Sequence, residues 1–356
     1  MRVRAATIAL LGGLLGCPSA LADDCKPQSR ITTLQMEPTT DRREEFVPAR
    51  IQGVRKLMLL DTGGAMTEIT TETTDELHLV RRRGNFRLYD MYGEFSDHFA
   101  EGSLEVTPLK ADAVALAIAP GRRLFGDDTA IAGVLAPDIL KNYDVDLDFG
   151  ADTMTLFEPD HCPGKVIYWK ADSVAVVPMR VLHSGHIIVP VTLDGKRVMA
   201  TLDTGAYNTT LSIPFAESVF GLKLGTVDTP RVGNLLGKES AATYRHVFQT
   251  LAFGDIEVKN LQVQIIPDLL HQVLVDASTP PTGTRIRDPR KLEADAGMLI
   301  GMNILRHFHV YIAYKEEKLY ITPTVEKPLD VPTAGAPPPA TPANFRMRAG
   351  LPLPPP

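Results

Sequence analysis

The chain has 356 residues, of which 44% are hydrophobic and 22% are charged, and its formal net charge is −6. This length allows two domains with cores of their own, and the composition is that of an ordinary globular protein. The negative charge gives a nucleic-acid partner no electrostatic support, and no internal stretch is long and apolar enough to cross a bilayer.

The N-terminal segment over residues 1–22 has the pattern of a signal peptide. Arg2 and Arg4 precede an apolar run over residues 5–16, and Ala20-Leu21-Ala22 is typical of a cleavage site. The sequence therefore predicts an exported protein, either periplasmic or secreted.

The chain contains three cysteines, Cys17, Cys25 and Cys162. Leu14-Leu15-Gly16-Cys17 resembles a bacterial lipobox, so a lipoprotein anchored through Cys17 is an alternative to simple export. Cleavage after residue 22 would leave an even pair, and such a pair in an exported chain predicts a disulfide between Cys25 and Cys162. Two free thiols are the alternative.

A first lobe is expected over residues 31–159. It begins with an edge strand at 31–36 and continues with a hairpin that turns at Gly53. The other expected elements are a strand over 66–73, a hairpin over 86–99 that turns near Tyr92 and Gly93, strands over 103–118 broken at Pro108 and Asp112, an apolar strand and short helix over 131–140, and a hairpin over 145–157.

A linker is expected over residues 160–173 and a second lobe over 174–323. This lobe repeats the early hairpin and the late apolar strand with its short helix, at 299–305. A glycine-bearing stretch at 231–237 takes the place of the first lobe's hairpin. Residues 276–295 are expected to form a long surface loop, and the Pro-rich tail over 324–356 is expected to be disordered.

The two early hairpins can be aligned without a gap. Residues 47–63 read VPARIQGVRKLMLLDTG, and residues 189–205 read VPVTLDGKRVMATLDTG. Val, Pro, the turn glycine, an arginine, the last leucine and Asp-Thr-Gly stand in register. Since the late apolar element is also repeated in the same order, the sequence indicates tandem duplication of a whole β lobe.

The chain resembles the aspartic proteases of the pepsin and retropepsin type, in a bacterial form with both lobes in one chain. The resemblance rests on the two Asp-Thr-Gly motifs at Asp61 and Asp203, and on two late apolar elements. Of these, Leu299-Ile300-Gly301 matches the family pattern, and Val134-Leu135-Ala136 matches with alanine in place of glycine. The resemblance implies an all-β, bilobal fold of two barrel-like lobes with a cleft between them.

The resemblance also implies an aspartic endopeptidase that cleaves polypeptides without a metal or cofactor. Asp61 and Asp203 would meet at the lobe interface, share one proton and activate a water molecule. Thr62 and Thr204 would exchange hydrogen bonds across the interface, while Gly63 and Gly205 would present backbone N–H groups to the carboxylates. Because one chain supplies both aspartates, a monomer would be sufficient.

Two departures from the family pattern fall in the first lobe, at Gly64 and Ala136. They leave open an alternative function, a non-catalytic peptide-binding or scaffold protein on the same fold. Candidates for a flap over the cleft are Tyr89, Tyr92, Gly93, Gly233 and Gly237.

Two pairs of histidines, His183 with His186 and His307 with His309, raise the alternative of a metal site. No carboxylate or cysteine cluster accompanies either pair in sequence, and neither has the spacing of a zinc protease motif. No metal is therefore expected.

Overall fold

A computed structural model describes residues 25–41, 43–89, 95–119, 125, 128–182, 184–235, 241–267 and 296–324. Several sequence predictions lie outside these residues: the signal peptide, the lipidation of Cys17, the flap candidates Tyr92, Gly93 and Gly237, the metal-ligand candidate His183, the surface loop over 276–295, and the Pro-rich tail apart from Thr324.

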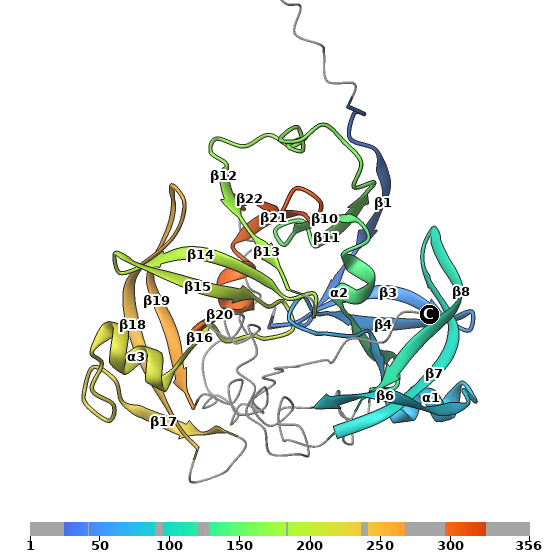
Figure 1. Cartoon of the computed structure of the whole chain (residues 1–356), viewed down its shortest axis with the longest axis horizontal. Helices are drawn as coiled ribbons and strands as arrows, with labels where there is room; N and C mark the ends of the chain where they lie inside the picture. The colour runs from blue at the N-terminus through green and yellow to red at the C-terminus, as the bar shows by residue number, and fades with distance from the viewer. Residues whose placement is uncertain are drawn as a thin grey trace, which may run out of the picture.

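The described residues are folded mostly into strands (Figure 1). The elements of the first half are β1 (Arg30–Gln35), β2 (Glu37–Pro38), β3 (Glu45–Ile51), β4 (Val54–Leu60), β5 (Glu68–Ile69), α1 (Thr71–Glu76), β6 (Arg81–Tyr89), β7 (Phe95–Val106), β8 (Leu109–Ile118), β9 (Ile131–Leu135), α2 (Pro137–Leu140), β10 (Asp144–Asp148) and β11 (Thr153–Phe157).

The second half repeats this order after the linker. Its elements are β12 (Ala175–Pro178), β13 (Arg180–Val181), β14 (Ile187–Leu193), β15 (Lys196–Leu202), β16 (Thr210–Ser212), α3 (Ile213–Phe220), β17 (Arg231–Asn234), β18 (Ala242–Phe253), β19 (Ile256–Ile266), β20 (Met298–Ile300), α5 (Met302–Leu305), β21 (Phe308–Ala313) and β22 (Lys318–Pro323).

Each half closes a six-stranded barrel. In the first half the order is β3-β4-β9-β5-β8-β7, and β3 also pairs with β7 to complete the ring. In the second half the order is β14-β15-β20-β16-β19-β18, closed by β14 and β18. The two barrels correspond strand for strand, so the predicted all-β, bilobal fold class is confirmed.

Two features shape the matching hairpins β3–β4 and β14–β15: the backbone conformation of their turn residues and the alternation of buried and less buried side chains along their strands. Their turns lie at Gln52-Gly53 and Asp194-Gly195, where all four residues have positive φ. Two consecutive positive φ values are typical of the tight turn that suits the twist of a hairpin, and glycine adopts them at no steric cost. Along β3 and β14 every second side chain is buried in the barrel interior.

A third sheet joins the two lobes, with the strand order β1-β11-β10-β21-β22-β12. At its centre β10 of the first half pairs antiparallel with β21 of the second, with Asp146 opposite Tyr311. In Figure 1 this sheet lies between and above the two barrels. The sequence alone predicted only a separate hairpin in each half. It gave no sign that β10 pairs with β21, because these strands lie far apart in the chain.

The chain between the lobes packs on this shared sheet. Trp169 stacks on His309 with ring centroids 4.0 Å apart, and its indole N–H donates to Thr322 Oγ1 at 3.1 Å. His309 Nε2 lies 2.6 Å from Asp146 Oδ1, and His161 Nε2 lies 2.5 Å from Asp144 Oδ2. His309, which the sequence raised as a metal ligand, is therefore engaged in a buried pair with a carboxylate.

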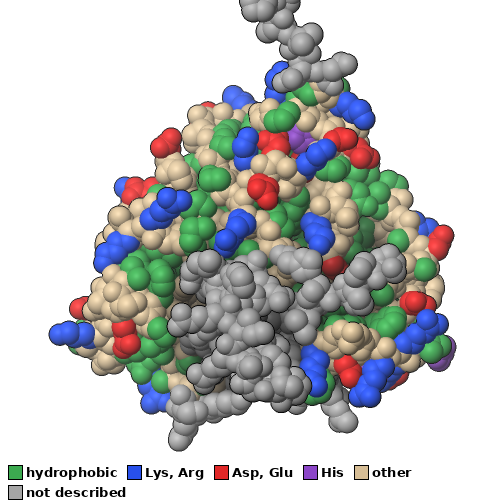
Figure 2. All heavy atoms as spheres, viewed as in Figure 1, with side chains coloured by type: hydrophobic (Ala, Val, Ile, Leu, Met, Phe, Trp, Pro, Cys, Tyr) green, Lys and Arg blue, Asp and Glu red, His purple; other side chains and the backbone are tan. Residues whose placement is uncertain are grey.

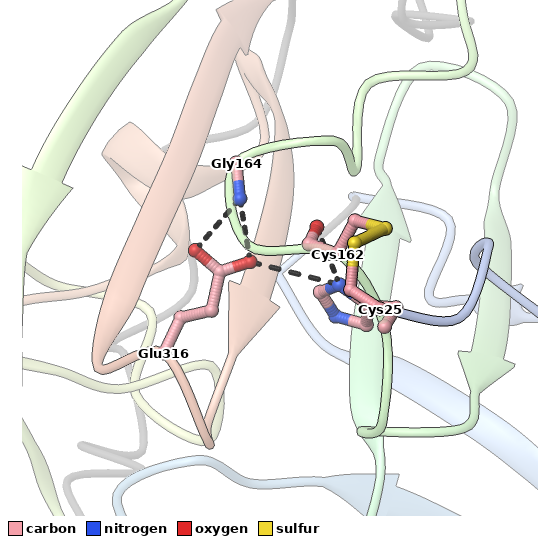
Figure 3. The surroundings of a disulfide bond; sticks show 5 residues. Cys25, Cys162, Gly164 and Glu316 are labelled. Atoms are coloured by element: carbon pink, nitrogen blue, oxygen red, sulfur yellow. Dashed lines mark hydrogen bonds and ion pairs between the residues drawn. A yellow bond between two sulfur atoms is a disulfide. The ribbon is translucent and has the colours of Figure 1, made fainter. Parts of the chain in front are cut away.

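Cys25 and Cys162 are joined in a disulfide (Figure 3). The bond ties the N-terminal arm to the start of the linker. Beside it, the Gly164 N–H donates to both oxygens of the Glu316 carboxylate, at 3.0 and 3.1 Å. Glu316 comes from the turn between β21 and β22, so the arm, the linker and the end of the second half meet at one place.

Replacing both cysteines by serine is expected to lower the free energy of unfolding by about 2–5 kcal/mol, because the bond closes a long loop in the unfolded chain. The two cysteines are 137 positions apart. The measurement is thermal unfolding with and without a reductant. The wild type should lose stability in the reductant and the double variant should not; a reductant effect of equal size on both would contradict the assignment.

Two local predictions for the first lobe are wrong. The strand expected over 66–73 ends at Ile69, and helix α1 follows because Thr70 caps it, its side chain accepting a hydrogen bond from the Thr73 N–H. The break expected at Asp112 does not occur, since that residue lies inside β8; the expected break at Pro108 falls in the turn between β7 and β8.

The surface carries charges of both signs. On the face in Figure 2, lysine and arginine side chains are interspersed with acidic and hydrophobic ones.

Within the described part of the chain, no helix has both the length and the apolarity needed to cross a membrane.

Candidate active site

The two Asp-Thr-Gly motifs stand at equivalent ends of β4 and β15. The Asp61 N–H donates to the Leu135 carbonyl oxygen, and the Asp203 N–H donates to the Ile300 carbonyl oxygen, each at 3.0 Å. Leu135 and Ile300 end β9 and β20, which run parallel to β4 and β15. Parallel pairing brings the carboxyl ends of neighbouring strands to the same edge, so each aspartate leaves its barrel beside the late apolar element.

Thr62 and Thr204 link the two loops across the lobe interface. The Thr62 N–H donates to Thr204 Oγ1 at 3.0 Å, and the Thr204 N–H donates to Thr62 Oγ1 at 3.1 Å. Each hydroxyl in turn donates to a carbonyl oxygen of the other lobe, Thr62 to Leu202 at 3.0 Å and Thr204 to Leu60 at 2.8 Å. Both threonines are buried, so these four bonds are shielded from water and fix the loops relative to each other.

The carboxylates lie against the glycines of the opposite loop. A Cβ added to Gly63 would stand 2.2 Å from Asp203 Cγ, and one added to Gly205 would stand 2.4 Å from Asp61 Cγ. Only glycine allows so close an approach. The same glycines donate to their own aspartates, Gly63 N–H to Asp61 Oδ1 at 3.0 Å and Gly205 N–H to Asp203 Oδ1 at 2.8 Å.

The two aspartates form a buried acidic pair. Asp61 is 0% exposed and Asp203 is 1% exposed. Burial, together with the negative charge of Asp61, raises the pKa of Asp203 well above its usual range, against the opposing effect of the Gly205 and Ala206 N–H groups. The pair therefore retains a proton at a pH where a free aspartate has lost it, and this proton belongs to the pair rather than to either residue.

Each aspartate has one carboxyl oxygen that accepts backbone hydrogen bonds and one that does not. Oδ1 of both residues accepts backbone N–H groups, whereas Oδ2 of both is buried and receives no hydrogen bond from the described residues. Two buried carboxyl oxygens without protein donors can bind and polarise a small polar molecule such as water.

A second pair of polar contacts holds the chain that follows each motif. Thr67 donates to the Asp138 carboxylate through its N–H at 2.9 Å and its hydroxyl at 2.7 Å. In the second lobe Thr209 donates to Asn303 Oδ1 in the same way, at 2.8 and 2.7 Å. None of these four residues was predicted from the sequence as part of the site. Extending the motif comparison to residues 61–67 and 203–209 would have shown the repeated threonine.

The comparison with known protein families now identifies this architecture. Residues 189–304 match the family model described as aspartyl protease. That range contains Asp203 and its supporting residues, and the first lobe repeats the same strand order around Asp61. This is an aspartic-protease fold.

The chain is similar to several solved structures, among them the following three. The aspartic proteinase from Irpex lacteus has 12% identity and a TM-score of 0.46, with 82% of this chain and 97% of that chain covered. A retropepsin-like aspartic protease from Rickettsia conorii has 16% identity and a TM-score of 0.30, with 43% and 95% covered. Basic 7S globulin from soybean has 9% identity and a TM-score of 0.44, with 83% and 95% covered. No match was found among curated protein sequences.

The pair of Asp-Thr-Gly loops is not fully symmetric. Asp203 Oδ1 accepts a second N–H, from Ala206 at 3.1 Å, whereas the equivalent Gly64 N–H donates to the Asp61 backbone oxygen at 3.3 Å. Asp138 of the first lobe likewise corresponds to Asn303 of the second. Burial raises the pKa of the Asp138 carboxyl, although hydrogen bonds from Thr67 oppose this shift.

Asp138→Asn is expected to raise the melting temperature at neutral pH, because it removes a partly buried charge and keeps an acceptor for Thr67, as Asn303 does for Thr209. A carboxyl whose pKa is raised on folding binds more protons in the folded state, so its cost appears as the pH rises above about 4. The stabilisation should fade as the pH is lowered through that window. A variant that melts below wild type at neutral pH would show that the hydrogen bonds of the carboxylate outweigh its burial.

The flap remains a prediction. Tyr89 ends β6 and Gly233 lies in β17, each on the outer hairpin of its lobe, while Tyr92, Gly93 and Gly237 lie outside the described residues. Among the residues that the structure describes, no group of three or more His, Cys, Asp or Glu side chains is placed to hold a metal ion.

Proposed function

We propose that this protein is an aspartic endopeptidase that hydrolyses peptide bonds with a water molecule activated between Asp61 and Asp203. The observation that supports the proposal most is the meeting of two buried carboxylates, one from each lobe, in which burial and the negative charge of Asp61 raise the pKa of Asp203. Perturbed carboxyl pairs of this kind are typical of acid–base sites.

The mechanism follows from one shared proton. The ionised member of the pair accepts a proton from the water as its oxygen attacks the peptide carbonyl carbon, and the protonated member donates to the developing oxyanion. The tetrahedral species then collapses: one of its hydroxyl groups returns a proton to the pair, the C–N bond breaks, and the amine leaves with the proton that the pair took from water, so the pair again holds one proton. The reciprocal hydrogen bonds between Thr62 and Thr204 hold the two loops together, and so keep both carboxylates at the required separation during the reaction.

A non-catalytic peptide-binding protein is the second candidate, and one observation favours it. The first lobe departs from the second at Gly64 and Ala136, so that Asp61 accepts one N–H where Asp203 accepts two. Against it stands the intact Asp-Thr-Gly motif of both lobes.

The experiment that separates the two functions is digestion of unfolded casein at acidic and neutral pH, with and without pepstatin. The endopeptidase proposal expects internal cleavage that pepstatin stops. Binding of peptides without cleavage at any pH would favour the scaffold instead.

We further propose that the protein acts as a monomer after export. Both aspartates come from one chain, so a second copy is not needed to complete the site, and the disulfide suits an oxidising compartment. Light scattering of the active protein tests the first point: activity confined to a dimer would contradict it. Cell fractionation tests the second, and protein retained in the cytoplasm would contradict it.

A further inference from the structure

The two lobes place one methyl group differently behind their aspartates. The first lobe has Gly64 after its Asp-Thr-Gly motif and Ala136 at the end of its late apolar element. The second lobe has Ala206 and Gly301 at the corresponding places. Each lobe thus carries one glycine and one alanine at this pair of positions, in opposite order.

In the second lobe the glycine is required by space. Gly301 has φ −103° and ψ −175°, and Ala136 has nearly the same backbone angles, φ −116° and ψ 171°, so the conformation itself does not demand glycine. A Cβ on Gly301 would stand 2.7–2.8 Å from the carbonyl oxygens of Ala206, Tyr207 and Asn208. The loop after Asp203 therefore packs directly on the backbone of Gly301.

Hydrogen bonds hold the second-lobe loop in that position. The Met302 N–H donates to the Ala206 carbonyl and the Asn303 N–H to the Tyr207 carbonyl, both at 2.8 Å. The first-lobe counterpart of Met302 is Pro137, which has no N–H to donate. Further along, both loops are held in the same way, where Thr67 donates to the Asp138 carboxylate and Thr209 donates to Asn303.

The missing methyl of residue 64 matches the added methyl of residue 136. A Cβ on Gly64 would stand 3.2 Å from Ala136 Cβ and 3.1 Å from Asp61 Oδ2. Both distances are tighter than ordinary van der Waals contact, so a methyl on residue 64 would press on the Asp61 carboxylate and on the Ala136 methyl, and the Ala136 methyl occupies the space into which it could otherwise shift. In the second lobe, a methyl on Ala206 is accommodated next to a glycine at position 301.

We propose that Gly64 and Ala136 act as a matched pair that positions the Asp61 carboxylate, with the Ala136 methyl filling the space that the missing methyl of residue 64 leaves. Ala136 is thus a positioning residue. The glycine at 64 and the alanine at 136 compensate for each other, so they are one coupled change and not two independent departures from the second lobe. The effect on peptide hydrolysis rests on the proposed function, but the packing relation itself does not.

The test is a double-mutant cycle of Gly64→Ala, Ala136→Gly and the two together. Gly64→Ala is expected to lower kcat at least about tenfold with little change in KM, because a small misplacement of a reacting group is costly. Adding Ala136→Gly should restore kcat to within about threefold of the Ala136→Gly single variant. Gly64→Ala with wild-type kcat, or a double variant no better than Gly64→Ala, would overturn the proposal.

The second lobe supplies the matched control. Gly301→Ala should not be rescued by Ala206→Gly, because the atoms that obstruct its Cβ are backbone oxygens that remain after the second change. Rescue in both lobes alike would show that general loosening, and not this methyl pair, restores the site.

Melting temperatures of the same variants keep the two proposals separate. If the wild type cleaves no peptide, the proposed function fails. The melting temperatures of the variants then still show whether Gly64 and Ala136 act as a matched pair. The double variant melting above Gly64→Ala would support the matched pair, and equal melting temperatures would overturn it.

Discussion

Asparagine in place of either Asp61 or Asp203 is expected to abolish peptide hydrolysis to within detection. The substitution keeps the size of the side chain and an acceptor for the Gly63 or Gly205 N–H. It removes one of two carboxyls that must share a proton, so the water loses its base or the oxyanion loses its acid. Each role is typically worth ~10²–10⁴ in rate, and the pair performs both.

The folded state should tolerate these changes. The raised pKa of Asp203 means that the folded protein binds an extra proton above the usual aspartate range, so its stability falls as the pH rises through that window. Asp203→Asn removes this cost, and its melting temperature at neutral pH should equal or exceed that of wild type. The gain should shrink toward acidic pH, where the wild-type pair is protonated in both states.

Asp160→Asn is the matched control, since Asp160 is an exposed aspartate that pairs with Lys315. It should leave the rate of casein or peptide cleavage unchanged. More than about a tenth of wild-type activity in either active-site variant would exclude a shared pair as the mechanism. Equal inactivity of wild type and both variants, with undiminished peptide binding, would instead favour the scaffold function.

Gly63→Ala is expected to eliminate activity as well, and to destabilise the protein. The added Cβ would lie 2.2 Å from Asp203 Cγ and 2.5 Å from both carboxyl oxygens. The loops cannot separate without breaking the four buried bonds of Thr62 and Thr204. Overpacking of a rigid interior typically costs ~1–3 kcal/mol.

The measurements for this variant are peptide cleavage and thermal unfolding, with Gly102→Ala as the control. A Cβ on Gly102 in β7 would meet Leu79 at an ordinary 3.4 Å, so that variant should keep wild-type activity and stability. A Gly63→Ala protein as active as Gly102→Ala would mean that the two carboxylates do not approach the opposite loops as closely as described.

Much of this fold could be predicted because the chain repeats itself. Each hairpin is local, with a glycine turn and alternating side chains, and the repeat of Asp61-Thr62-Gly63 as Asp203-Thr204-Gly205 marked both loops in advance. The cross-lobe bonds of Thr62 and Thr204 were expected only through the resemblance to aspartic proteases, since no local pattern indicates a partner 142 positions away.

The features that sequence reasoning missed depend on contacts between distant segments. The pairing of β10 with β21 joins Asp146 to His309, residues 163 positions apart, and no periodicity links them. Helix α1 was missed because β-branched residues dominate its start, while its cap is a single hydrogen bond to Thr70. The departures at Gly64 and Ala136 could be read from the sequence, but their mutual fit required the distance between the two positions.

The pH dependence of kcat/KM on a single good peptide shows whether Asp61 and Asp203 share one proton. A pair that shares one proton is active only when singly protonated, so we expect a bell-shaped profile for the free enzyme. Its alkaline limb should lie above the usual aspartate range, in the direction in which burial and Asp61 shift the pKa of Asp203. Activity that rises steadily into the alkaline range, with no falling limb, would show that hydrolysis does not depend on a proton shared by Asp61 and Asp203.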